Sequence, residues 1–232
     1  MNLRLILLFL LSALISCQED NLDDEVLEPL DSLNNGNDNG TDNQKMGTPC
    51  IDGFAGKYPC KGYDLLAHID LSTLGSGQGN DCWGWTDSST GKEYVLMGLD
   101  NGTAFVDINE STNPILIGKL PTTTENSSWR DIKVYDNHAY IVSEADSHGV
   151  QVFDLTRLRE ANPPENFSPD RVLQTVPTAH NMVVNPDSGY GYVVGTDKKD
   201  DFRGGVHFLD LNNPQSIKFV GGYADAGYSH DA

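Results

Sequence analysis

The 232-residue sequence predicts an all-β fold built from repeated four-stranded units, and three observations support this prediction. A polar pair returns every 50 residues, and its second member is Asp or Asn each time. Each copy that continues runs into apolar or aromatic residues with strand preference. The residues after the pair also repeat: a second strand-like segment, a third that opens at a glycine, and a fourth that a proline precedes. The copies of the pair are Asn80-Asp81, Arg130-Asp131, His180-Asn181 and His230-Asp231.

Four strands are expected in each unit. They are residues 80–85, 93–98, 102–108 and 115–120 in the first unit, 130–135, 138–143, 149–155 and 171–176 in the second, and 180–185, 190–195, 205–211 and 217–222 in the third. Four short strands in about 50 residues are typical of a β-propeller blade, and a propeller ring usually holds ~4 to 8 blades. Residues 80–232 contain three repeats and the start of a fourth. Because three blades would leave open sheet edges, we expect an incomplete N-terminal portion of a longer propeller.

Residues 1–16 are predicted to be a lipoprotein signal peptide. Their apolar run from Leu5 to Leu11 is too short for the roughly 20 residues that span a bilayer. The adjoining Leu14-Ile15-Ser16-Cys17 resembles the lipobox of bacterial lipoproteins, in which the cysteine becomes the lipidated N-terminus. Gln18-Glu19-Asp20 resembles the acidic tag that directs such proteins to the cell surface, so we expect an exported outer-membrane lipoprotein. An ordinary signal peptide with a chance cysteine is the alternative.

Residues 17–46 are predicted to be a disordered acidic tether. From Gln18 to Met46, nine Asp or Glu stand against one lysine, and aromatic and β-branched residues are scarce. Such a segment cannot bury enough apolar surface to offset the entropy lost on ordering.

Residues 47–79 are predicted to contain a disulfide loop and a closing strand. Cys50 and Cys60 are expected to pair, because an exported chain passes through a compartment where thiols oxidise. The closing strand is expected within Asp64–Leu71, which resembles the fourth strands of the repeats. Cys82 lies inside a repeated strand, and we expect it to be a buried free thiol.

The repeats also resemble a known family. The stretches that carry the resemblance are Asn80–Asp87, Trp129–Val134, Asn137–Glu144, Gln151–Leu155 and Gly227–Asp231. Together they are similar to the bacterial choice-of-anchor B proteins, which are exported and built of LVIVD-type propeller repeats. The resemblance covers roughly residues 50–232. It implies a propeller, an extracellular location and further blades after Ala232, and it implies no reaction.

The polar pairs are the candidate binding residues, because the first strand of a propeller blade lines the central channel. They are Asp81, Arg130, Asp131, His180, Asn181, His230 and Asp231. Imidazole and carboxylate groups converging there would suit a divalent metal or a polar ligand. The favoured alternative is structural, with each Asp or Asn accepting a hydrogen bond from a backbone N–H of the neighbouring blade. We therefore assign no catalytic residue and no metal ligand, and the cofactor is unknown.

Other polar and aromatic residues are expected to be structural. Asp107, Asp154 and Asp210 end the third strands and are predicted to form turns. His148 and His207 lack repeated partners, and we expect them at the surface. The three tryptophans, Trp83, Trp85 and Trp129, are expected to pack between blades, although an aromatic binding surface is the alternative.

Composition and motifs favour a binding protein over most enzyme classes. The net charge of −19 disfavours nucleic acid as a partner and leaves the lipid on Cys17 as the membrane contact. The sequence has no G-x-S-x-G, P-loop, H-E-x-x-H or dinucleotide motif. We predict a lipid-anchored surface propeller that acts as a non-enzymatic binding or scaffolding module for an unknown protein or glycan. The alternative is a propeller enzyme, such as a metal-dependent hydrolase with its site at the central channel.

Overall fold

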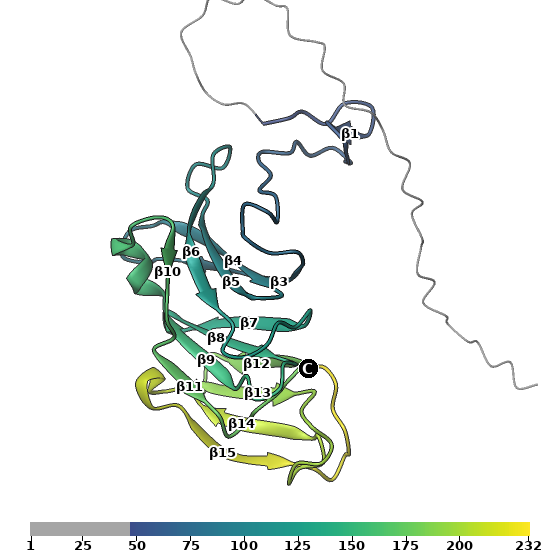
Figure 1. Cartoon of the computed structure of the whole chain (residues 1–232), viewed down its shortest axis with the longest axis vertical. Coiled ribbons are helices and arrows are strands. Elements are labelled where there is room, and N and C mark those ends of the chain that lie inside the picture. The colour runs from purple at the N-terminus through teal and green to yellow at the C-terminus, as the bar shows by residue number, and fades with distance from the viewer. Residues whose placement is uncertain (1–46) are drawn as a thin grey trace, which may run out of the picture. The chain divides into compact units, whose positions relative to one another are not determined.

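Strands make up almost all the regular structure of residues 47–232, the part of the chain that the computed structural model describes (Figure 1). The strands form one small hairpin and three larger sheets, so the predicted all-β fold is confirmed. The predicted signal peptide, the acidic tether and Cys17 lie outside the described residues.

The three sheets correspond to the three sequence repeats. The first has the strand order β10-β6-β5-β4-β3, the second β11-β9-β8-β7, and the third β12-β13-β14-β15. In the first sheet the strands are β3 (Gly79–Thr86), β4 (Glu93–Leu99), β5 (Gly102–Asp107), β6 (Ile115–Pro121) and β10 (Glu165–Asn166). In the second they are β7 (Arg130–Tyr135), β8 (His138–Ser143), β9 (Val150–Asp154) and β11 (Arg171–Leu173). In the third they are β12 (Asn181–Asn185), β13 (Tyr190–Val194), β14 (Val206–Asp210) and β15 (Lys218–Tyr223). All the predicted repeat strands are therefore present, and neighbours within each repeat pair antiparallel.

The strand β10 was not predicted, and it joins the second repeat to the first sheet. It comes after the 3-10 helix η1 (Leu155–Glu160) and pairs in parallel with β6, placing Glu165 opposite Gly118. A Cβ atom on Gly118 would lie 2.3 Å from the carbonyl oxygen of Glu165. The close approach of the two backbones therefore requires glycine at this position.

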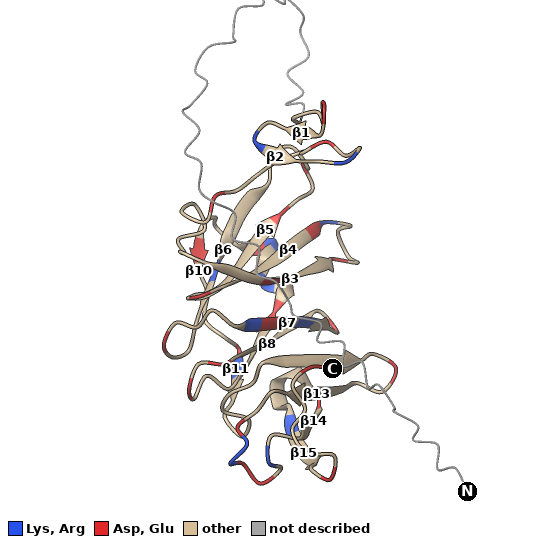
Figure 2. Cartoon of the chain, turned by 90° about the vertical axis from the view of Figure 1, so that its right-hand side faces the viewer, with Lys and Arg blue, Asp and Glu red and all other residues tan. Residues whose placement is uncertain are grey.

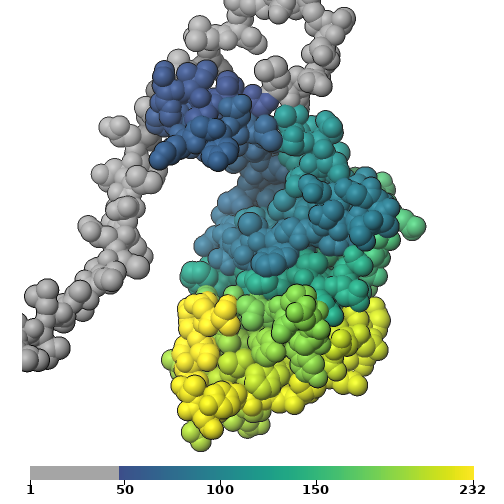
Figure 3. Space-filling view, turned by 180° about the vertical axis from the view of Figure 1, so that it is seen from behind, coloured from purple at the N-terminus to yellow at the C-terminus, as the bar shows by residue number. Residues whose placement is uncertain are grey.

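Two hydrophobic clusters lie between successive sheets. The cluster between the first and second sheets includes Leu96, Ile132 and the rings of Phe105 and Phe153, whose centroids are 4.7 Å apart. The cluster between the second and third sheets is formed by residues that include Tyr140, Val152, Met182, Val193 and Leu209. Figure 3 shows the surfaces of successive segments in contact, with colour following the chain from blue through green to yellow. Neighbouring sheets are thus packed face to face, and the described strands form no closed barrel or ring.

The segment 47–79 contains the hairpin of β1 (Phe54–Ala55) and β2 (Tyr58–Pro59). The predicted disulfide between Cys50 and Cys60 is confirmed. The closing strand expected within Asp64–Leu71 is not a strand here, and its one β-bridge joins Leu65 to Thr48. Instead, Ile69 and Leu74 pack on the face of the first sheet that is turned away from the second. In residues 47–232, no helix has the length and apolar character needed to cross a membrane.

Cys82 is exposed, so the expectation of a buried thiol is wrong. It pairs across the ladder with Met97, on the face that only the segment around Ile69 and Leu74 covers among the described residues. The equivalent residues Ile132 and Met182 are completely buried because each faces the preceding sheet. The same repeat position therefore has a different environment in the first sheet.

Candidate functional site

The first strands of the three sheets, β3, β7 and β12, are neighbours in space and carry the repeated polar pairs at their beginnings. In the first two pairs, the second member accepts a hydrogen bond from the backbone of the next first strand. Asp81 Oδ2 accepts from Ile132 N at 2.9 Å, and Asp131 Oδ2 accepts from Met182 N at 2.8 Å. Asn181 Oδ1 accepts from Ala232 N at 3.3 Å. These contacts are the structural hydrogen bonds that the sequence favoured. The first two join neighbouring sheets, and the third joins β12 to the segment that follows β15.

Asp131 is also paired with a lysine. Lys133 Nζ lies 2.7 Å from Asp131 Oδ1 and 4.0 Å from Asp81 Oδ2, and it lies 4.7 Å from the centre of the Trp83 ring. Burial raises the pKa of Asp131, while the hydrogen bonds from Lys133 and Met182 oppose this shift. The carboxylates of the first and second repeats are therefore occupied by internal partners.

The side chain of Arg130 is buried in the protein interior. It is 1% exposed, its Nε donates to the carbonyl of Leu99 at 2.9 Å, and its Nη1 lies 2.9 Å from His148 Nε2. Burial lowers the pKa of Arg130 to about 10, and burial together with the charge of Arg130 lowers the pKa of His148 to about 4. His148 and His207 are buried, so the expectation that they lie at the surface is wrong.

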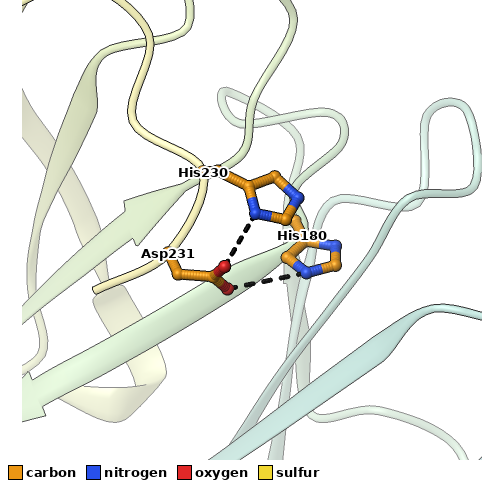
Figure 4. A group of neighbouring side chains, drawn as sticks. All are labelled: His180, His230 and Asp231. Carbon is orange, nitrogen blue, oxygen red and sulfur yellow. Dashed lines mark hydrogen bonds and ion pairs between the residues drawn. The ribbon is translucent and has the colours of Figure 1, made fainter. Parts of the chain in front are cut away.

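The remaining pair residues, His180, His230 and Asp231, converge at one place (Figure 4). The carboxylate of Asp231 lies beside the two imidazole rings and faces one nitrogen of each. Its Oδ2 is 2.7 Å from His230 Nδ1, and its Oδ1 is 3.6 Å from His180 Nε2. The two rings are stacked with their centroids 4.2 Å apart. Of the predicted ring residues, Asp81 and Asp131 therefore have structural roles. His180, His230 and Asp231 instead form a cluster of three potential metal ligands.

Glu144 and Trp129 support this cluster, although the sequence pattern did not connect them with it. His180 Nδ1 lies 2.6 Å from Glu144 Oε1, and the Trp129 ring is 5.4 Å from the His180 ring. Glu144 comes directly after β8, whereas Asp100 comes directly after β4 and Gly195 directly after β13. No periodic signal could therefore have identified it.

An open depression of about 250 Å³ adjoins these residues. It is lined by Asn80, Asp81, Trp129, Arg130, Asp131, His180 and Asn181. Trp129 is 50% exposed and Trp83 is 40% exposed, whereas Trp85 is buried between the first two sheets. The prediction that tryptophans pack between blades thus describes Trp85 alone among the three.

The three aspartates that end the third strands form turns, as predicted. Asp107, Asp154 and Asp210 each accept a hydrogen bond from the backbone N–H two residues later, at 2.9, 2.9 and 3.0 Å. These side chains stabilise the turns after β5 and β14 and the beginning of η1 after β9.

The chain matches no protein-family model and no curated protein. The resemblance to the choice-of-anchor B proteins therefore stays a prediction.

Proposed function

We propose that this chain is a lipid-anchored, surface-exposed protein of the β-propeller type that acts as a non-enzymatic binding or scaffolding module. Three sheets of equivalent topology, linked by the same backbone hydrogen bond at each step, are consistent with successive propeller blades. The disulfide between Cys50 and Cys60 is consistent with an exported protein. The resemblance to choice-of-anchor B proteins points the same way.

The exposed ring of Trp129 beside the polar depression is the observation that carries the binding function. A tryptophan side chain has a large apolar surface, which is usually buried. The side chain of Trp129 is 50% exposed, whereas that of Trp85 is buried in the same fold. The polar residues Asn80, Asp81 and Asn181 also line the depression. An aromatic ring next to fixed polar groups suits the apolar faces and hydroxyl groups of a sugar, so a glycan is the favoured ligand.

The charge distribution supports a neutral or polar ligand over a polyanion. Figure 2 shows Lys and Arg on separate segments of the described chain, with Asp and Glu also scattered along it. Nucleic acids bind clustered basic residues. The proposal therefore includes no nucleic acid.

Tryptophan fluorescence can test the ligand class with a panel of soluble neutral and acidic oligosaccharides. We expect at least one of them to change the emission saturably, and we expect Trp129→Ala to abolish the binding. Trp83→Ala removes a second exposed tryptophan and serves as the matched control. Binding that survives Trp129→Ala unchanged would contradict the proposed site, and a panel with no binder would contradict the glycan class.

The anchor has a separate test, because Cys17 lies outside the described residues. We expect Cys17→Ser to release the protein from the outer membrane, since the acyl chains are the proposed membrane contact. Membrane fractionation of cells that express either form measures this. A variant that still sediments with the outer membrane would contradict lipidation at Cys17.

A metal-dependent hydrolase is the second candidate function. The observation that favours it is the convergence of His180, His230 and Asp231. Release of product from a panel of ester and glycoside substrates, with and without added metal, would distinguish it from a binding module.

A further inference from the structure

We propose that His180, His230 and Asp231 bind a divalent first-row transition-metal ion such as Zn²⁺. Each residue offers one ligand atom, and these three atoms all lie within 4.8 Å of one another. Two imidazoles and one carboxylate form a donor set typical of Zn²⁺ sites in which a fourth position stays open. This site goes beyond the proposed binding function and does not depend on it.

His180 is the ligand that the fold orients in advance. Glu144 Oε1 lies 2.6 Å from its Nδ1 and, as a carboxylate, can only accept there, so the neutral ring carries its proton on Nδ1 and presents Nε2 toward Asp231. A carboxylate that binds the second nitrogen of a histidine ligand fixes both the tautomer and the ring orientation. The His180 side chain is only 17% exposed and lies beside the ring of Trp129. This nitrogen is therefore held in place before any metal arrives.

His230 and Asp231 are exposed and can adjust to the ion. Their side chains are 55% and 63% exposed. Ligand atoms around a tetrahedral Zn²⁺ lie about 2.0 to 2.2 Å from the metal and so about 3.3 to 3.6 Å from one another. The 3.6 Å between His180 Nε2 and Asp231 Oδ1 already fits this geometry. The site closes when the His230 ring moves, which replaces its hydrogen bond to Asp231 by a bond to the metal.

The backbone holds residues 229–232 against the third sheet. Gly195 N donates to the carbonyl of Ser229 at 2.7 Å, and Ser229 N donates to the carbonyl of Gly204 at 3.0 Å. A Cβ atom on Gly195 would lie 2.3 Å from His180 Cβ and 3.1 Å from the carbonyl oxygen of His230. Glycine at position 195 thus allows the two histidine backbones to approach each other closely.

The donor set also determines which ions should bind. Ca²⁺ and Mg²⁺ prefer oxygen ligands and would gain little from two imidazoles. Zn²⁺, Co²⁺, Ni²⁺ and Cu²⁺ accept imidazole nitrogen readily. The competing description is a cluster of ion pairs and hydrogen bonds in which Asp231 bridges two histidines without any metal.

Isothermal titration of the tag-free, chelator-treated protein with Zn²⁺ and with Mg²⁺ distinguishes the two descriptions. We expect one saturable Zn²⁺ site per chain and no measurable heat from Mg²⁺. We expect His180→Ala and His230→Ala each to weaken Zn²⁺ binding by about 100-fold or more, and Glu144→Ala by about 10- to 100-fold. The matched control is His138→Ala, which removes a histidine whose ring contacts the carbonyl of Asp136 instead.

Circular dichroism of each metal-free variant shows whether it is folded. If His180→Ala does not fold, His230→Ala still tests the site, because the His230 side chain is largely exposed. Wild-type protein that takes up no Zn²⁺ would overturn the proposal and leave the ion-pair cluster. Zn²⁺ binding of equal affinity in a folded His230→Ala protein would also overturn it, since the ion would then bind elsewhere.

Discussion

Asp87 and Arg159 form a bidentate ion pair across 72 residues of sequence. Arg159 Nε and Nη2 each donate to the Asp87 carboxylate at 2.7 Å. The Asp87 side chain is completely buried and also accepts hydrogen bonds from Ser89 and Thr90. The pair therefore connects the turn after β3 in the first sheet to the helix η1 of the second repeat.

We expect Arg159→Ala to destabilise the protein and to change how its stability depends on pH. The hydrogen bonds from Arg159 are the main cause that holds the pKa of Asp87 below its ordinary value of 3.8. A carboxyl group with a lowered folded-state pKa stabilises the protein above pH about 4, and this contribution is lost as the pH falls further. Thermal melts from about pH 2 to about pH 7 cover the range in which carboxyl groups titrate. Acid should lower the melting temperature of Arg159→Ala less than that of wild type. Lys61→Ala, which removes an exposed positive charge, is the control, and equal acid sensitivity in all three proteins would contradict the assignment.

The backbone link at Asp131 gives a second prediction. Asp131→Ala should lower the free energy of unfolding by about 1 to 3 kcal/mol, because it leaves the buried Met182 N–H without its acceptor. Asp131→Asn should lose less, since the amide of Asn181 accepts the equivalent hydrogen bond from Ala232. Chemical denaturation measures both values, with the exposed Asp146→Ala as the control. Equal losses in Asp131→Ala and Asp146→Ala would show that this link contributes nothing.

His148 should make the protein less stable in mild acid. Its pKa falls from 6.5 to about 4 on folding, so the unfolded chain binds the proton more tightly than the folded chain. Stability is therefore complete above pH about 6.5 and decreases as the pH falls toward 4, by on the order of 3 kcal/mol for this residue. Denaturation of His148→Gln at several pH values should show a shallower decrease than wild type. His138→Gln should retain the wild-type slope, and parallel curves for wild type and His148→Gln would rule out this source of acid sensitivity.

The cysteines of residues 47–232 should differ in reactivity. Cys82 is exposed and free, whereas Cys50 and Cys60 are paired. Mass spectrometry after iodoacetamide treatment should find Cys82 modified in the native protein and the other two modified only after reduction. In the chain-entropy model, closing this short loop stabilises by about 2 to 3 kcal/mol, so a double Cys50→Ser, Cys60→Ser variant should lose that amount at most. A labelled Cys50 or Cys60 in the native, unreduced protein would contradict the pairing.

The strand positions could be predicted because each repeat carries its own local signals. Alternating apolar residues, a glycine before the third strand and an Asp after it recur in all three units. The spacing of Asp81, Asp131 and Asn181 also anticipated their backbone hydrogen bonds, since equivalent residues in a repeat meet equivalent neighbours.

Features that depend on contacts between repeats could not be predicted from these local signals. Cys82 and Ile132 occupy equivalent positions, yet only Ile132 faces another sheet. His148 is buried in contact with the side chain of Arg130, 18 residues away in sequence, and no local pattern reveals this contact. Glu144 belongs to the candidate site through an identity that the other repeats do not share. The repeat pattern thus identified His180, His230 and Asp231 as candidates, but it did not show that these three, among the predicted ring residues, converge.

The parallel pairing of β10 with β6 has a consequence for how the molecule opens. The strand β10 belongs in sequence to the second repeat but pairs with β6 of the first sheet. Arg159 of η1, which precedes β10, also binds Asp87 after β3, so two contacts join the second repeat to the first sheet. Neither sheet can therefore unfold without breaking contacts of the other, so the two should exchange their amide hydrogens as one cooperative unit. No comparable exchanged strand joins the second and third sheets within residues 47–232. The third sheet, which carries His180 and its partners, should consequently open more often, and the candidate site should reside on the more labile part of the described chain.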